Sequence, residues 1–82
     1  MEAEGHFGVR MVFEDGVLEV FSHGKSSIRL AAGTDVPIVR APFKDGLRVT
    51  IRHPDGPPML AFNAEQKAAV EALLDAFEAA GR

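Results

Sequence analysis

Residues 60–81 of this chain read LAFNAEQKAAVEALLDAFEAAG, a short apolar strand followed by a helix with its own start and stop signals. Asn63 is a residue type that caps helices, and Gln66 three positions later completes a pair that resembles a capping box. Gly and Pro are absent from residues 64–80, so a helix over 64–80 is predicted, with Gly81 closing its end. Apolar residues recur at i, i+3, i+4 and i+7 along one stripe of this helix: Val70, Leu73, Leu74 and Phe77.

The residues before the helix show the alternation of short β-strands joined by turns. The clearest alternation lies at 47–53, where Leu47, Val49 and Ile51 are separated by polar residues. Further strands are predicted at residues 7–13, 17–22, 27–30, 36–41 and 58–62, with turn signals at 14–16, 44–46 and 54–56. The strand at 17–22 is apolar on both faces, so its orientation stays open. Pro37 and Pro42 confine the strand at 36–41 to an edge or a bend.

These elements predict an α+β, mainly β fold. We expect a bent antiparallel sheet or partly open barrel of five to seven short strands, capped by one C-terminal amphipathic helix that buries its stripe on the sheet. An alternative for the stripe is a partner groove or a homodimer interface. A chain of 82 residues is expected to form a single domain, 1–82, with residues 1–5 disordered.

Composition and charge exclude some classes of function. The net charge is −3, yet residues 20–53 contain six basic and two acidic residues, so the middle of the chain is basic and its ends are acidic. An acidic chain without Trp or Tyr is a poor candidate for binding nucleic acid. Cysteine is absent, and the N-terminal residues do not resemble a signal peptide, which favours a cytoplasmic protein. Heavy use of Ala, Gly, Val, Arg and Asp is typical of GC-rich, bacterial coding sequences.

The element order resembles the bacterial pleckstrin-homology-like domains, in which a final helix caps a strongly bent antiparallel barrel. The strand PPMLAF at 57–62 and the helix that follows it carry this resemblance most specifically. It implies a non-enzymatic binding or scaffolding module. Lipid-binding members carry basic residues around the first hairpin, whereas residues 13–16 here read FEDG and are acidic. That departure argues against phosphoinositide binding.

A phosphate-loop-like motif and three histidines suggest a nucleotide site and a metal site, but neither set has the spacing that such a site needs. SHGKSS at 22–27 contains the Gly-Lys-Ser of a phosphate-binding loop, but position 19 is Glu where that loop needs Gly, and a strand pattern follows where it needs a helix. We interpret it as a hairpin turn. His6, His23 and His53 lie in separate segments without the spacing of metal ligands. We therefore expect no cofactor and no metal.

The candidate binding residues are the basic residues of the middle section. Arg48 and Arg52 lie about 13 Å apart on one face of a strand. They would form a basic stripe if the strand of Arg29 lay beside them. The full candidate set is Lys25, Arg29, Arg40, Lys44, Arg48 and Arg52.

Several interpretations of these residues remain open. They could be a solvated face that deters edge pairing, or a patch that docks an acidic partner, a phosphorylated ligand or an anionic membrane surface. The favoured hypothesis is a module that binds protein segments through a sheet edge or the basic face. Peripheral binding to anionic lipid is the second hypothesis. A small enzyme or ligand carrier that uses the open end of the barrel is the third.

Overall fold

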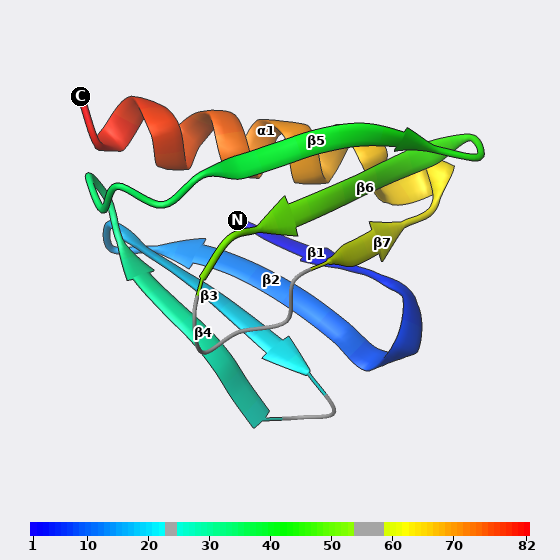
Figure 1. The fold of residues 1–82 in the computed structure, drawn as a ribbon, viewed down its shortest axis with the longest axis horizontal. Coiled ribbons are helices and arrows are strands. Elements are labelled where there is room, and N and C mark those ends of the chain that lie inside the picture. Colours follow the sequence, from blue (N-terminus) through cyan, green and yellow to red (C-terminus); the bar gives the residue numbers. More distant parts are fainter. Residues whose placement is uncertain (23–24, 54–58) are drawn as a thin grey trace.

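The computed structural model describes residues 1–22, 25–53 and 59–82, with the backbone alone for residues 25–27. Two antiparallel sheets and one long helix make up these residues (Figure 1). Sheet A has the order β1 (Glu2–Glu4), β2 (Val9–Glu14), β3 (Val17–Ser22) and β4 (Lys25–Ala31). Sheet B has the order β5 (Ile38–Phe43), β6 (Gly46–Ile51) and β7 (Leu60–Phe62). The helix is α1 (Ala64–Ala80), and a one-turn 3-10 helix, η1 (His6–Gly8), connects β1 to β2.

This architecture confirms the predicted α+β class with a bent antiparallel sheet and a C-terminal helix. Within the described residues no strand pairing joins the two sheets, so they do not close into a barrel. Helix α1 contacts β1 and β2 of sheet A and β6 and β7 of sheet B, and it lies along one side of both sheets (Figure 1). The helix therefore covers the opening between the two sheets.

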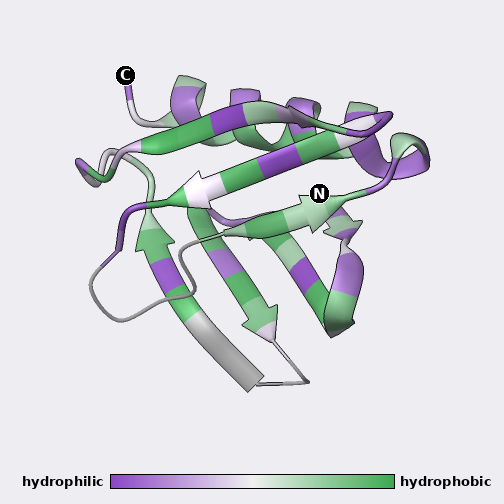
Figure 2. Cartoon of the chain, turned by 45° about the vertical axis from the view of Figure 1, so that its right-hand side comes forward, coloured by the Kyte–Doolittle hydropathy of each residue, from purple (hydrophilic) through white to green (hydrophobic). Residues whose placement is uncertain are grey.

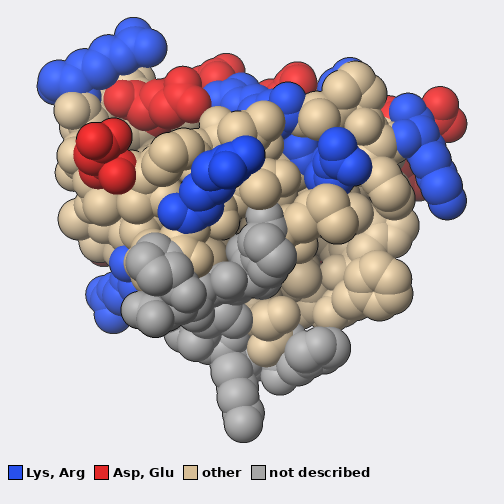
Figure 3. Space-filling view, in the orientation of Figure 1, with Lys and Arg blue, Asp and Glu red and all other residues tan. Residues whose placement is uncertain are grey.

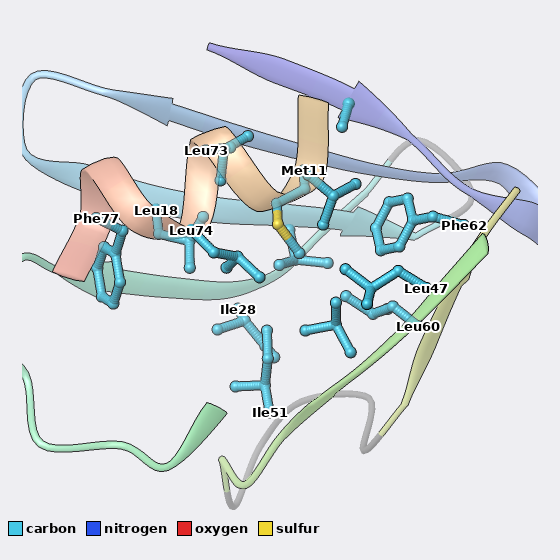
Figure 4. Packing of buried hydrophobic residues seen from close by; sticks show 14 of the residues in the cluster. Met11, Leu18, Ile28, Leu47, Ile51, Leu60, Phe62, Leu73, Leu74 and Phe77 are labelled. Carbon is cyan, nitrogen blue, oxygen red and sulfur yellow. The ribbon is translucent and has the colours of Figure 1, made fainter. Parts of the chain in front are cut away.

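A single apolar cluster holds the three parts together. Hydropathy alternates along most of the strands (Figure 2), and the buried side chains of both sheets and of α1 point into one shared interior (Figure 4). The helix contributes the predicted stripe, all of it buried: Val70, Leu73, Leu74 and Phe77. Burying an aliphatic or aromatic side chain of this size contributes about 1.5–3 kcal/mol, so the stripe is a main source of stability.

The helix begins and ends where the sequence predicts, and its first turn also binds β1. The side chain of Asn63 caps the helix, because its Oδ1 accepts a hydrogen bond of 3.2 Å from the backbone N–H of Gln66. The side chain of Gln66 does not complete a capping box, because it bonds to β1 instead of to the backbone of Asn63. Its Oε1 accepts a hydrogen bond of 3.2 Å from the backbone N–H of Glu4. The glutamine therefore links the start of α1 to the N-terminal strand.

The prediction of disorder at residues 1–5 is wrong. Residues 2–4 form β1, which pairs with β2 and places Ala3 opposite Met11. Both of these side chains are buried. The sequence offers only one small apolar residue between two glutamates, which is too weak a pattern to predict a strand. The pairing with β2 and the link to Gln66 hold the segment in place.

The first predicted strand also begins later than expected. The predicted strand at 7–13 includes Phe7, but β2 starts at Val9 and Phe7 is 85% exposed. Phe7 and Gly8 have backbone φ angles of 60° and 73°, both in the left-handed region. Two such residues turn the chain between β1 and β2, which points Phe7 out of the sheet.

The structure shows which face of the strand at 17–22 is buried and whether the proline-flanked strand lies at a sheet edge. Leu18 and Val20 are buried, so these residues define the inward face of β3. Strand β5 is an edge strand, as its prolines predict. Asp15 and Gly16 form the two-residue turn between β2 and β3 with φ angles of 52° and 75°, as the Asp-Gly signal predicts. The turn predicted at 54–56 lies outside the described residues.

Candidate functional site

The candidate site is the outward side of sheet B. Leu47, Val49 and Ile51 of β6 are buried, so the residues that alternate with them face away from the core. Strand register places the outward residues of β5 beside them, and the same alternation applies to Leu60 and Phe62 of β7. We call this surface the sheet B face; its residues are Val39, Ala41, Arg48, Thr50, Arg52, Met59 and Ala61.

Charge on the sheet B face has one sign. The strands β5, β6 and β7 contain no Asp or Glu, whereas strands β1, β2 and β3 of sheet A contain four glutamates. Figure 3 views the molecule from the side of sheet B and shows Lys and Arg spread over this surface, while Asp and Glu gather mainly along the upper edge. The basic middle section of the sequence therefore becomes a basic surface on one sheet.

Arg48 lies near the centre of the sheet B face between two small residues. Its neighbours across the strands are Ala41 of β5 and Ala61 of β7, so its side chain is exposed and uncrowded. Arg52 follows four residues later, about 13 Å along the same face. In the part of the chain that the structure describes, neither arginine forms an ion pair. Among the described residues there is therefore no ion pair that an external anion would have to break in order to bind either guanidinium group.

Apolar side chains border these two arginines. Val39 is 46% exposed and Met59 is 55% exposed. Neither residue was selected by the sequence analysis, although the alternation at 58–62 already places Met59 opposite in direction to Leu60. The face is thus mixed in character, with aliphatic and thioether groups around two cations.

Arg40 does not belong to this face. It pairs with Val49 in the strand register and so lies on the inward side of β5, beside α1. Its Nη2 atom lies 2.9 Å from Asp75 Oδ1 and 3.1 Å from Glu78 Oε1, and its side chain is only 25% exposed. Partial burial alone would lower the pKa of Arg40, but the hydrogen bonds with Asp75 and Glu78 outweigh it and raise that pKa. Arg40 is a cross-link between β5 and α1.

Arg29 is also separated from the predicted stripe. It lies on β4 of sheet A, opposite Glu19 of β3, and it is exposed. Ile28 and Leu30 on either side of Arg29 pack into the same core as Val49 of sheet B. The outward sides of the two sheets therefore face away from one another. Arg29 cannot join Arg48 and Arg52 in one patch, and the side chain of Lys25 lies outside the described residues.

Lys44 lies at the tip of the β5–β6 hairpin, at one end of the sheet B face. Its backbone φ is 52°, and its Nζ atom is 5.7 Å from the centroid of the Phe43 ring. The ring of His6 packs edge-on against Phe43 with centroids 6.0 Å apart. Lys44 was among the predicted binding residues, but the sequence does not predict that its neighbour Phe43 packs against His6, because these two residues are far apart in the chain.

The structure describes only part of the Gly-Lys-Ser motif and two of the three histidines. Backbone from Lys25 onward forms strand β4, so the helix that a phosphate-binding loop requires is missing after Gly-Lys-Ser; residues 23–24 lie outside the description. His6 lies in η1 and His53 follows β6. No cluster of three His, Asp or Glu side chains suited to a metal ion occurs among residues 1–22, 25–53 and 59–82.

Within the described residues, no helix has both the length and the apolar character needed to cross a membrane. We found no match to this chain among protein-family models, curated proteins or solved structures.

Proposed function

We propose that this protein is a non-enzymatic interaction module that binds an acidic segment of a partner protein on the sheet B face. One observation carries the proposal: Arg48 and Arg52 are exposed on a surface whose strands contain no carboxylate, and the described residues supply no ion-pair partner for either. Elsewhere, Arg10 lies 3.6 Å from Glu2 and Arg40 pairs with two acidic residues of α1.

The composition of the face favours a polypeptide. Protein interfaces are enriched in Arg and Met and poor in acidic residues, as this surface is. Ala41 and Ala61, on either side of Arg48, have short side chains that do not obstruct it. An extended segment can therefore approach the guanidinium group of Arg48. Complementary charge would then orient the segment and raise its rate of association.

The fold supports the same class of function. The seven strands among the described residues, in two antiparallel sheets followed by a C-terminal helix, agree with the order of elements implied by the resemblance to pleckstrin-homology-like domains. We propose membership of that superfamily on this basis. Binding and scaffolding are the common roles in that group, although a fold alone does not determine function.

The proposal can be tested by NMR, by adding a short glutamate-rich peptide and following the backbone amide chemical shifts of the protein. We expect shifts at Arg48, Thr50 and Arg52, weaker at higher salt because charge attraction is screened. A matched peptide with glutamine in place of glutamate should leave these amides unmoved. If vesicles containing phosphatidylserine shift this face and the peptide does not, the partner is a membrane and the proposal is wrong. Equal effects of the glutamate and glutamine peptides would also overturn it.

A further inference from the structure

A pocket opens at the end of sheet B, where three segments of the chain meet. It has a volume of about 260 Å³ and a mainly apolar surface. Its walls come from η1, from the β5–β6 turn and from the start of α1; they include His6, Phe43, Lys44 and Ala64. Pockets for small molecules usually measure about 300–1,000 Å³, so this one suits a single large side chain better than a cofactor.

Aromatic rings form one side of this pocket. The rings of His6 and Phe43 pack edge to face with centroids 6.0 Å apart, and the centroid of the Phe7 ring, outside the lining, lies 6.2 Å from that of His6. The ammonium group of Lys44 lies over Phe43. An apolar side chain entering here would meet ring surfaces, with a cation at the edge. Aromatic residues, Phe among them, are enriched in protein interfaces.

Unfavourable backbone conformations lie beside the same pocket. Among the described residues, three other than glycine have positive φ: Phe7, Asp15 and Lys44. Asp15 is unremarkable, because aspartate tolerates this conformation in an Asp-Gly turn. Phe7 and Lys44 are residue types that rarely adopt it. Lys44 lines the pocket, and Phe7 lies outside the lining, next to His6. Strained residues of this kind concentrate at functional sites.

Burial does not account for the position of Phe7. Its side chain is 85% exposed, so it contributes little to the core while its backbone occupies a disfavoured region. Glycine or asparagine would fit this backbone better. The structure therefore displays a large aromatic group beside His6, one of the residues that line the pocket, where local stability would favour a smaller residue.

We infer that this pocket anchors one large apolar side chain of the acidic segment that the sheet B face binds. The inference rests on the proposed function and names the kind of segment. Asp45 and Glu65 also line the pocket, so they would repel an acidic side chain and favour an uncharged one. The acidic residues of the segment would instead lie over Arg48 and Arg52.

Strand geometry sets the spacing of such a segment. Phe43 pairs with Gly46 at the pocket, and Arg48 lies two residues further along β6. Two residues of an extended chain span about 7 Å and four span about 13 Å. An extended segment with its apolar anchor in the pocket would therefore need acidic residues about two and six positions from the anchor, to reach Arg48 and Arg52 respectively. The direction of the segment decides whether these positions follow or precede the anchor.

The test uses two peptides that differ at one position. Both carry glutamates two and six residues from the anchor position in a glycine-serine background, and the anchor is leucine in one and alanine in the other. We expect the leucine peptide to bind about tenfold more tightly, which is the lower end of the effect of filling an apolar pocket. Phe43→Ala should remove most of that difference, because it takes away a ring that lines the pocket.

The outcomes separate the two claims. Equal affinities of the two peptides, with binding that still depends on Arg48, would overturn the anchor pocket and leave the proposed function standing. Failure of both peptides to bind would overturn the proposed function together with the inference. A leucine effect that is unchanged by Phe43→Ala, without chemical-shift changes at Lys44 or Gly46, would place the anchor elsewhere and contradict the inference.

Discussion

Phe7 combines an exposed aromatic ring with a left-handed backbone, which makes it the sharpest test at the scale of single residues. Phe7→Gly should leave the free energy of unfolding unchanged or raise it by up to about 1 kcal/mol, because glycine relieves the backbone and little packing is lost. Urea denaturation measures this. The matched control is Phe13→Gly, where the ring packs against Phe77 with centroids 5.8 Å apart.

The control should lose about 3 kcal/mol or more, because it removes packing against the core and places glycine inside a strand. A loss in Phe7→Gly as large as that in Phe13→Gly would show that Phe7 is a structural residue. The description of Phe7 as an exposed residue that contributes little packing would then be wrong.

Gly46 is required by close packing. A Cβ atom at this position would overlap the carbonyl oxygen of Phe62 and approach Asn63 Cα to 2.9 Å, and neither is a flexible side-chain end. We expect Gly46→Ala to destabilise the protein by more than about 2 kcal/mol through displacement of β7 and of the helix start. Gly16→Ala is the comparison, because its Cβ would meet open space.

At Gly16 the only unfavourable feature for alanine is the backbone φ of 75°. The expected loss in the free energy of unfolding is therefore about 1 kcal/mol. Thermal unfolding of both variants tests the difference. Equal losses would mean that β7 moves easily away from Gly46, contrary to the packing described.

At the scale of secondary-structure elements, Arg40 joins β5 to α1. Arg40→Met keeps most of the aliphatic stem and removes both ion pairs, so we expect a loss of about 1 kcal/mol in low salt, since its two partners are largely exposed. The loss should shrink in high salt, where screening weakens the pairs. Urea denaturation at two salt concentrations measures it.

Arg48→Met is the matched control, because Arg48 has no ion pair in the described part of the chain. It should change the free energy of unfolding by less than about 0.5 kcal/mol at either salt concentration. If Arg48→Met proved as destabilising as Arg40→Met, the distinction between a cross-linking arginine and a binding arginine would fail.

The contrast between α1 and Arg40 explains what a sequence can predict about elements. The helix bounds, its cap and its buried stripe follow from residues within one turn of each other, so local patterns suffice. The direction of Arg40 depends on the register of β5 against β6 and on the position of α1, and the contact of Arg40 with α1 joins residues 38 positions apart in the chain. Charge and residue type alone could not separate it from Arg48.

At the scale of the whole molecule, β1 connects sheet A to the helix. Removing residues 1–5 should lower the free energy of unfolding by more than about 2 kcal/mol, because the deletion removes the backbone hydrogen bonds of β1 and uncovers Met11 and part of α1. Chemical denaturation of the shortened chain measures the loss. Unchanged stability would restore the interpretation of residues 1–5 as a disordered tail.

The two-sheet arrangement decides which basic residues act together. Alternation in the sequence correctly predicts that Arg29, Arg48 and Arg52 face outward. It does not predict that β4 and β6 belong to different sheets with a shared core, because that depends on how the chain crosses from Ala31 to Ile38. The candidate set of six therefore reduces to Arg48 and Arg52, with Lys44 at the hairpin tip.

Charge reversal on one sheet or the other tests this account most directly. Arg48→Glu and Arg29→Glu change the net charge equally and alter exposed positions on opposite sheets. Fluorescence anisotropy with a labelled glutamate-rich peptide should show a loss of affinity of about tenfold or more for Arg48→Glu, since it places like charges together. Arg29→Glu should cause only the small loss that general repulsion produces. Equal losses in both variants would contradict a binding site on the sheet B face.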